Sequence, residues 1–437
     1  MDRLASQNFE VGGLRFYGLT VFAGYSTSAL PLSQAGAALG SPGAATLGPD
    51  ENYGFSATLG WQIHHQRTDL SVLYSGTYQG SANYSDLNAY SQSLTVNSSR
   101  YFTPKLRLTF SGTAQDMTLA EFLFQPSTIL TQAPSNFNDL AAAASIGAFT
   151  NSQIAAMLTA SPVLQSPVVN SLIGTRILSY SGQLSLEYQA SQRLRFHFAS
   201  LSAGAQSRLN GEFNSSLQNG SVPRTFGLNA GAGFSYMLSP RTDLGFTAEE
   251  NRFNNVAQKA YTSNAYATIG RKMGMRWFLQ AHAGGSIITP VGSAPVIAKG
   301  HQIIGGGSIG FRTFRHSLIG TYERNTSDTY GFAVGTVSMY TGTWLYHAPG
   351  SRWTLFSTYS QEQIRNAGFV SMSGWQATGG ISQMLSRRTT LTAQYVYLSN
   401  TGTYNGSPTS FAVQSVRLSL GWSPQPGQSV GAPVVGN

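Results

Sequence analysis

The residues Ser415–Trp422, with the sequence SVRLSLGW, decide the fold of this chain. One phase of the stretch is apolar and comprises Val416, Leu418, Leu420 and Trp422; the other comprises Ser415, Arg417, Ser419 and Gly421. Successive side chains of a β-strand point to opposite faces of the sheet. The stretch therefore predicts a strand that shows one face to an apolar medium and the other face to a polar one.

The same alternation recurs along the chain, in segments of ten to thirteen residues. One segment sets Leu106, Leu108 and Phe110 against Lys105, Arg107 and Thr109, and a longer one covers Leu178–Tyr188. Tight basic turns join such segments at His65–Leu70, Thr103–Leu106, Ser191–Leu194, Ser239–Leu244, Pro349–Arg352 and Ser386–Leu391, and near Lys272 and Arg315. These eight turns predict eight hairpins. An opening strand near Leu14–Gly24 and a closing strand near Phe411–Trp422 bring the expected total to eighteen, within a range of 16–18.

The composition is that of a membrane protein that crosses with strands. Only 10% of the 437 residues are charged, against about 25% in soluble domains, and the mean hydropathy is −0.11. A helix needs ~20 consecutive apolar residues to span a bilayer, and no run approaches that length. A strand crosses with about ten residues and shows half of them to lipid. The absence of cysteine excludes disulfide and thiolate chemistry.

The predicted fold is therefore all-β: a transmembrane antiparallel up-and-down β-barrel with short periplasmic turns and long outer loops. The longer connections are expected at 27–50, 79–88, 116–175, 205–223, 249–258, 289–299, 324–328, 362–373 and 399–409. Their irregular lengths argue against a solenoid or a propeller, which repeats at a fixed period.

The domain organisation is simple. We expect one barrel over residues 14–422, preceded by a periplasmic segment, 1–13, and followed by a Pro/Gly-rich tail, 423–437. Because the first residues do not resemble a signal peptide, we expect the chain to be a mature form or to begin at a misplaced start codon.

The tryptophans support a membrane setting. Five of the six fall at strand ends beside the short turns, namely Trp61, Trp277, Trp344, Trp353 and Trp422, and Trp375 lies beside a long connection. Amphipathic rings of this kind form the aromatic girdles of membrane barrels. In a soluble β-protein, tryptophan is expected in the middle of a core strand.

These features together resemble Gram-negative outer-membrane porins. The alternation, the basic turns and a last strand that ends in Trp422 carry the resemblance, which covers residues 14–422 as a pattern. Ser415–Trp422 is similar to a barrel-assembly signal, although about fifteen residues follow it. Among large barrels, eighteen strands resemble the exopolysaccharide-secretion and sugar porins. The resemblance implies a location in the bacterial outer membrane, in contact with lipid and lipopolysaccharide.

Two enzyme motifs match this sequence, but their required structural context is missing. Gly305–Gly310 matches both G-x-G-x-x-G and G-x-S-x-G, but these motifs require a strand–turn–helix context. Here Phe311–Phe314 continues a strand, so the glycines are interpreted as marking a bend or a close backbone approach. The seven histidines show no metal-ligand spacing. We expect no enzymatic activity, no cofactor and no metal; a barrel-embedded hydrolase is the weakest alternative.

Charged residues mark the expected lumen. Inward strand phases are assigned to Lys105, Arg107, Glu187, Arg195, Arg276, Arg312, Glu323 and Arg417, because a charge at mid-depth in lipid would cost about 2–4 kcal/mol. Connection 116–175 carries the acids Asp116, Glu121 and Asp139 and no lysine or arginine. One hypothesis places this loop inside the barrel, where its acids would oppose a basic wall. The alternative, a mobile outer loop, has equal weight, since long loops are often disordered or bind partners.

The expected function is passive passage of hydrophilic solutes, or export of polysaccharide, through an outer-membrane channel. An exporter would also need a periplasmic partner. The alternative from another class is a structural or adhesive barrel whose long loops bind a partner. Nucleic acid is not an expected ligand, because no basic groove with interleaved stacking aromatics is found.

Deletion of residues 125–170 tests the loop hypothesis. If the loop narrows the lumen, the single-channel conductance of the deletion variant in a planar bilayer will rise, because the ion path widens. An unchanged conductance would contradict a constriction and favour an outer loop.

Overall fold

The structure, a computed structural model, describes most of the strand regions of the chain. The described residues are 10–11, 14–27, 48–83, 88–118, 176–209, 225–255, 259–291, 300–329, 333–348, 352–365, 370–404 and 407–424. The predicted segment 1–13 and the tail 423–437 lie largely outside these ranges, as does most of connection 116–175. Among the described residues, no helix is long and apolar enough to span a membrane.

Nineteen strands make up the described structure. They are β1 (Glu10–Val11), β2 (Leu14–Ser26), β3 (Asp50–His65), β4 (Thr68–Ser81), β5 (Ala89–Thr103), β6 (Leu106–Thr118), β7 (Arg176–Gln189), β8 (Leu194–Leu209), β9 (Thr225–Ser239), β10 (Thr242–Asn255), β11 (Lys259–Met273), β12 (Trp277–Val291), β13 (Gly300–Arg312), β14 (His316–Thr329), β15 (Ala333–His347), β16 (Trp353–Arg365), β17 (Val370–Met384), β18 (Thr389–Tyr404) and β19 (Ser407–Trp422).

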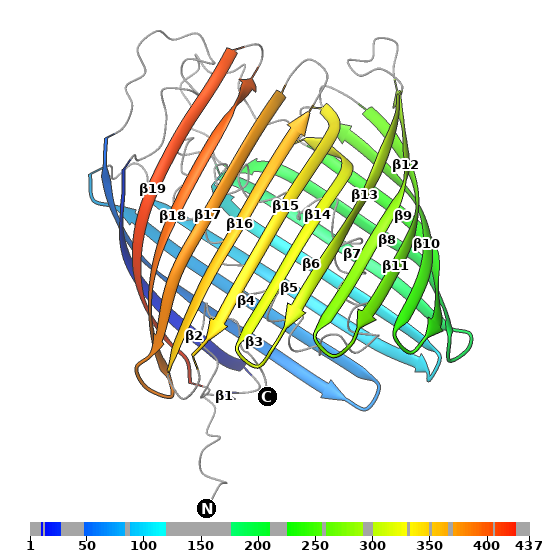
Figure 1. Cartoon of the computed structure of the whole chain (residues 1–437), viewed down its shortest axis with the longest axis horizontal. Coiled ribbons are helices and arrows are strands. Elements are labelled where there is room, and N and C mark those ends of the chain that lie inside the picture. The colour runs from blue at the N-terminus through cyan, green and yellow to red at the C-terminus, as the bar shows by residue number, and fades with distance from the viewer. Residues whose placement is uncertain are drawn as a thin grey trace, which may run out of the picture.

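The strands β2–β19 form a closed barrel. Each pairs antiparallel with the next along the chain, and β19 pairs antiparallel with β2, from Ser415 opposite Ser26 to Trp422 opposite Leu19. The two-residue strand β1 pairs with the start of β2 and is not part of the closed barrel wall. The predicted all-β up-and-down barrel of eighteen strands is confirmed (Figure 1).

Figure 1 shows the two ends of the barrel. The end with short connections, here the turn end, is where β2 begins and β19 finishes; we call the other the loop end. Eight short connections join β3–β4, β5–β6, β7–β8, β9–β10, β11–β12, β13–β14, β15–β16 and β17–β18, as the basic turns predict.

The strands are longer than the sequence pattern indicates. Those of the barrel span 13 to 16 residues, so several expected long connections are brief: β18 and β19, for example, are separated only by residues 405–406. The expected connection at 399–409 is therefore wrong. Hydrogen bonding continues past the membrane interface, where both faces meet water and the apolar alternation that marks a strand stops.

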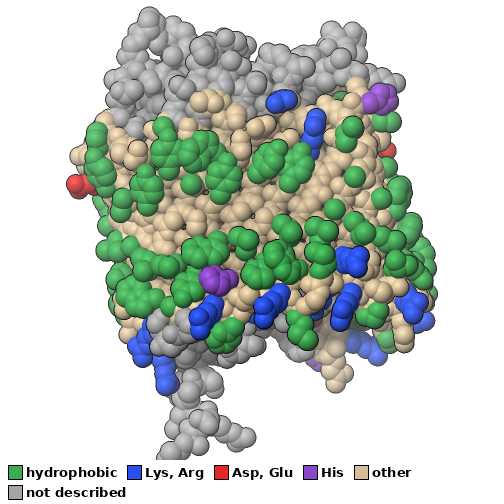
Figure 2. Space-filling model, in the orientation of Figure 1, with side chains coloured by type: hydrophobic (Ala, Val, Ile, Leu, Met, Phe, Trp, Pro, Cys, Tyr) green, Lys and Arg blue, Asp and Glu red, His purple; other side chains and the backbone are tan. Residues whose placement is uncertain are grey.

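The two faces of the wall have opposite polarity. On β19, Val416 and Leu418 are each 53% exposed, whereas Arg417 between them is 9% exposed. The same contrast runs along β11, whose buried and exposed residues alternate. Large apolar side chains cover the outside in an upper and a lower band (Figure 2). Polar side chains such as Thr262 and Ser286 occupy the inward phase and are almost wholly buried.

Candidate channel lining

Six of the predicted lumen charges have the inward phase of their strands. They are Arg107, Glu187, Arg195, Arg312, Glu323 and Arg417, each next to at least one outward apolar or aromatic residue. Lys105 and Arg276 do not: they lie in the turns that follow β5 and β11 and are exposed. The sequence pattern places Lys105 and Arg276 inside strands because an apolar residue follows each of them. Such a residue looks the same at the start of a strand as in its middle.

The predicted loop acids are mostly outside the described residues. Glu121 and Asp139 fall in the undescribed part of the chain. Asp116 lies in strand β6, opposite Gln92 and Leu178, on the outward phase, and not in a loop. The loop assignment of Asp116 is therefore wrong, because β6 continues to Thr118 beyond its last large apolar residue.

The tryptophans lie at two levels of the outer wall. Near the turn end, Trp277 packs on Phe311 with ring centroids 4.5 Å apart, and Trp422 packs on Phe16 at 5.7 Å. Trp61, Trp344 and Trp353 lie on the same half of their strands. Toward the loop end, Trp375 stacks on Tyr397 at 4.7 Å. This arrangement is typical of aromatic girdles at two interfaces.

A ladder of amides lines the inner face of β9–β11. The Glu249 carboxylate accepts hydrogen bonds from Asn264 Nδ2 at 3.1 Å and from Asn229 Nδ2 at 3.3 Å. Asn229 also donates to Asn251, which in turn donates to Thr262 Oγ1 at 3.3 Å. Register brings these residues together, because Glu249 stands opposite Asn264 and Asn251 opposite Thr262. The sequence shows none of this, since the partners come from three different strands.

The ladder continues across two more strands. Ser286 on β12 stands opposite Asn264, and Gln302 on β13 stands opposite Ser286. Asn229 Oδ1, Asn264 Oδ1 and Ser286 Oγ are buried and have no hydrogen-bond partner among the described residues. Buried polar atoms of this kind need a partner from water or a solute. The ladder is therefore a polar, tightly packed sector of the inner wall.

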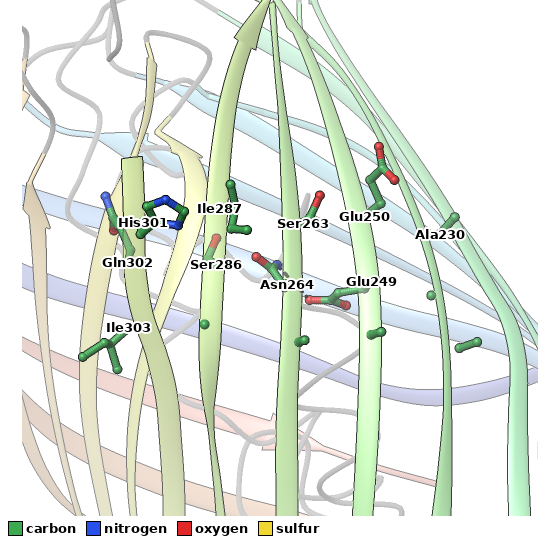
Figure 3. A pocket seen from close by; sticks show the side chains of 15 residues that line it. Ala230, Glu249, Glu250, Ser263, Asn264, Ser286, Ile287, His301, Gln302 and Ile303 are labelled. Atoms are coloured by element: carbon green, nitrogen blue, oxygen red, sulfur yellow. Dashed lines mark hydrogen bonds between the residues drawn. The ribbon is translucent and has the colours of Figure 1, made fainter. Parts of the chain in front are cut away.

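A cavity of about 1100 Å³ lies against the same sector, with a lining drawn from β9–β13 (Figure 3). Figure 3 shows Glu249 and Asn264 reaching toward each other between neighbouring strands. Most of its lining has the outward phase, including Ala248, Glu250 and Ile303, so the hollow lies on the outer face of the wall. Glu249 and Asn264, which have the inward phase, border it from the other side. Small outward residues leave this part of the wall thin.

A buried histidine–carboxylate pair bridges β12 and β14. His282 Nε2 lies 3.1 Å from Glu323 Oε1, and the two side chains are 5% and 8% exposed. Gly306 of β13 stands between them in register, opposite both residues. A Cβ atom at Gly306 would lie 2.4 Å from Glu323 Oε2. The glycine-rich run in β13 is therefore explained by close approach, as expected, and it makes room for this contact.

A second inward contact lies at the seam where the barrel closes. The guanidinium of Arg417 on β19 lies over the ring of Phe22 on β2, 3.4 Å from its centroid. The direct register partner of Arg417 is Gly24, which leaves space for the long side chain. A cation over an aromatic face is attracted by the ring quadrupole, most strongly where water is excluded.

Charges of both signs lie on the inner face of β6–β10. Glu187 stands opposite both Arg107 and His197, and its Oε1 lies 3.7 Å from His197 Nδ1. Arg107 also lies over the Tyr101 ring at 5.4 Å. Because acids and bases alternate around the wall, the described lining has no single sign of charge. No group of three potential metal-ligating side chains is found among the described residues.

No protein-family model matches the sequence, and no curated protein matches it. Among solved structures, Pseudomonas aeruginosa OccK2 (OpdF), in complex with glucuronate, is 13% identical, with a TM-score of 0.46 over 95% of this chain and 100% of that one. P. aeruginosa OccK1 (OpdK) is 10% identical, with a TM-score of 0.44 over 93% of this chain and 97% of that one.

The FrpB iron transporter of Neisseria meningitidis is 8% identical, with a TM-score of 0.41 over 93% of this chain and 81% of that one. At such low identities none of these structures assigns a role to a residue of this chain. The fold of this chain is instead established by its own strand pairing, a closed antiparallel barrel of eighteen strands.

A double-mutant cycle on His282 and Glu323 tests the buried pair. Truncating either residue to alanine leaves a buried polar partner, so the coupling in the free energy of unfolding should be about 1–3 kcal/mol. The matched control is the His197–Glu187 pair, whose side chains are 34% and 35% exposed. Its coupling should stay below about 1 kcal/mol. Equal couplings, measured by denaturant unfolding from lipid vesicles, would contradict the account.

Proposed function

We propose that the chain is a passive outer-membrane channel for hydrophilic solutes. The observation that carries the proposal is the inward phase of the closed barrel, where buried polar and charged side chains such as Arg417, Glu323 and Asn251 outnumber apolar side chains such as Phe22. The large exposed apolar side chains lie on the outward phase. A barrel of this strand number encloses an interior too wide for wall side chains alone to fill. Water in that interior gives hydrophilic solutes a path across the membrane, because they cannot cross its hydrocarbon core.

The chemistry of the lining favours the passage of hydroxylated solutes over that of ions of one sign. The amides of Asn229, Asn251 and Asn264 each present both a donor and an acceptor, and some of their oxygens have no partner among the described residues. A hydroxyl group that reaches this sector can both donate to and accept from amide groups. Saccharides and short polysaccharide chains fit this chemistry, whether they enter or leave, and the mixed charges of β6–β10 would not repel either class of ion.

Conductance and ion selectivity test the channel. In planar bilayers the purified protein should give stable open steps; silence from correctly folded protein would contradict the proposal and favour a structural barrel. Two adjacent acids on β10 supply a matched pair of variants, since Glu249 has the inward phase and Glu250 the outward phase and is exposed.

Charge reversal at Glu249 (E249K) should shift the reversal potential in a salt gradient toward anion preference, because the new cation faces the ion path. The same reversal at Glu250 (E250K) should leave the reversal potential unchanged. Equal shifts in both variants would mean that the assumed inside and outside of the wall are wrong. Heat-modifiable migration on gels establishes that each variant is folded.

A further inference from the structure

Each of the eight short turns has a basic residue directly before its second strand, and the turn between β17 and β18 has a second one, Arg387. We call the set the basic ring; its members are Arg67, Lys105, Arg193, Arg241, Arg276, Arg315, Arg352 and Arg388. All eight side chains are exposed. Blue side chains follow the turn end of the visible face in Figure 2.

Backbone hydrogen bonds fix these residues at one level of the barrel. The carbonyl oxygen of Arg241 accepts from the amide of Lys272, at the end of the second strand along, at 2.8 Å. The same bond occurs at every turn: Arg67 accepts from Tyr101, Lys105 from Gln189, Arg193 from Met237, Arg276 from Arg312, Arg315 from His347, Arg352 from Met384 and Arg388 from Ser423, all at 2.7–2.9 Å. The wall bonds the main chain of each ring residue, and the side chains remain exposed; the Arg352 guanidinium also donates to the Leu385 carbonyl at 3.4 Å.

A hydroxyl group two residues earlier shapes five of the turns. Ser239 Oγ accepts from the Arg241 amide at 3.2 Å, and Thr313 Oγ1 accepts from Arg315 at 3.3 Å and from His316 at 2.9 Å. Thr103, Ser191 and Ser386 do the same for Lys105, Arg193 and Arg388. Such side-chain-to-backbone bonds are a common turn device. They explain the turn geometry but do not require a cation, so the shared charge has another cause.

The depth of the basic ring matches the headgroup region of a membrane. Arg276 directly precedes the girdle residue Trp277, and Arg352 directly precedes Trp353. Just inside the ring, Arg100 and Arg271 have the outward, lipid-facing phase of β5 and β11 and are exposed. An arginine on the lipid side is tolerated where its guanidinium can extend to the polar interface.

The sign of the charged side chains differs between the inner and outer faces of the barrel and between its turn end and its loop end. Near the turn end, the acids Asp69, Glu187 and Asp243 have the inward phase, so they do not lie between the ring and the lipid. At the loop end the outward charges are mixed, with Glu250 beside Arg252 and Lys259. Among the described residues of β2–β19, exposed acids with the outward phase are thus confined to the loop end, and the exposed outward charges at the turn end are cations.

We propose that the basic ring binds the phosphate groups of anionic phospholipids in the leaflet at the turn end. Guanidinium groups pair with phosphate oxygens by charge-assisted, often bidentate hydrogen bonds. Eight cations at one level form a ring of phosphate sites around the barrel, and the girdle tryptophans of the turn end lie next to this level. The site is separate from the lumen, so it stands or falls independently of channel activity.

The test uses a ring variant of the full chain, with Arg193, Arg241, Arg315 and Arg388 replaced by glutamine (R193Q/R241Q/R315Q/R388Q). These substitutions keep the backbone carbonyls, so the barrel should fold. The control replaces four exposed loop-end cations, as R252Q/K259Q/R324Q/R365Q, with the same change in net charge. Native mass spectrometry counts phosphatidylglycerol and phosphatidylcholine retained from nanodiscs that contain equal amounts of each.

The unsubstituted protein should retain phosphatidylglycerol preferentially, and the ring variant should lose most of this preference, on the order of fivefold in affinity per cation removed. The control should keep the preference. Equal loss in both variants would overturn the proposal, since any surface cation would then serve. Retained preference in the ring variant would also overturn it, and would leave an acidic periplasmic protein as the partner to seek; single-channel recordings of both variants show whether the lumen is intact.

Discussion

The pairing of β19 with β2 is the interaction on which the rest of the structure depends. Inside a bilayer no water is present to satisfy a free strand edge, and each unsatisfied backbone group costs several kcal/mol. Ser415 to Trp422 close that edge against Ser26 to Leu19. Once the wall is closed, it has an inner and an outer face, and alternate residues of every strand lie on one or the other. The apolar phase contacts lipid, and the polar phase contacts the interior.

Space on the concave inner face is the second constraint. Side chains that point toward the axis converge, so long polar residues need glycine as a neighbour. His282 reaches Glu323 across Gly306, and Arg417 reaches Phe22 because its register partner is Gly24. Glycine in these strands therefore serves a different purpose from glycine in a turn. It permits contacts between residues that are not direct neighbours in the ladder.

Local features of the sequence predict the wall well. The phase of Ser415–Trp422 and the basic turns depend on adjacent residues only, and they are sufficient to give eighteen strands and the inward phase of Arg417. Strand ends are harder to predict. Lys105 and Arg276 are followed by the apolar residues Leu106 and Trp277, so the pattern does not show that a strand starts only after them. Near Asp116 both phases become polar, and the pattern no longer distinguishes strand from loop.

The inner contacts could not be predicted in the same way. His282 and Glu323 are 41 residues apart and sit two strands away from each other, so their meeting depends on the register of three strands and on the curvature of the closed wall. The amide ladder around Glu249 has the same origin. By contrast, the basic ring was visible in the sequence as a turn pattern, and the structure adds the backbone bonds that place its members at one level.

The central claim is that alternate residues of each strand face water and lipid, and the absence of native cysteine makes it directly measurable. Single cysteines at Thr392, Ala393, Gln394 and Tyr395 of β18 would be exposed to a small charged methanethiosulfonate reagent in reconstituted vesicles. We predict modification at 392 and 394, which have the half-buried inward phase, and none at 393 and 395, which face lipid. Uniform labelling, or labelling of 393 and 395 alone, would contradict the account.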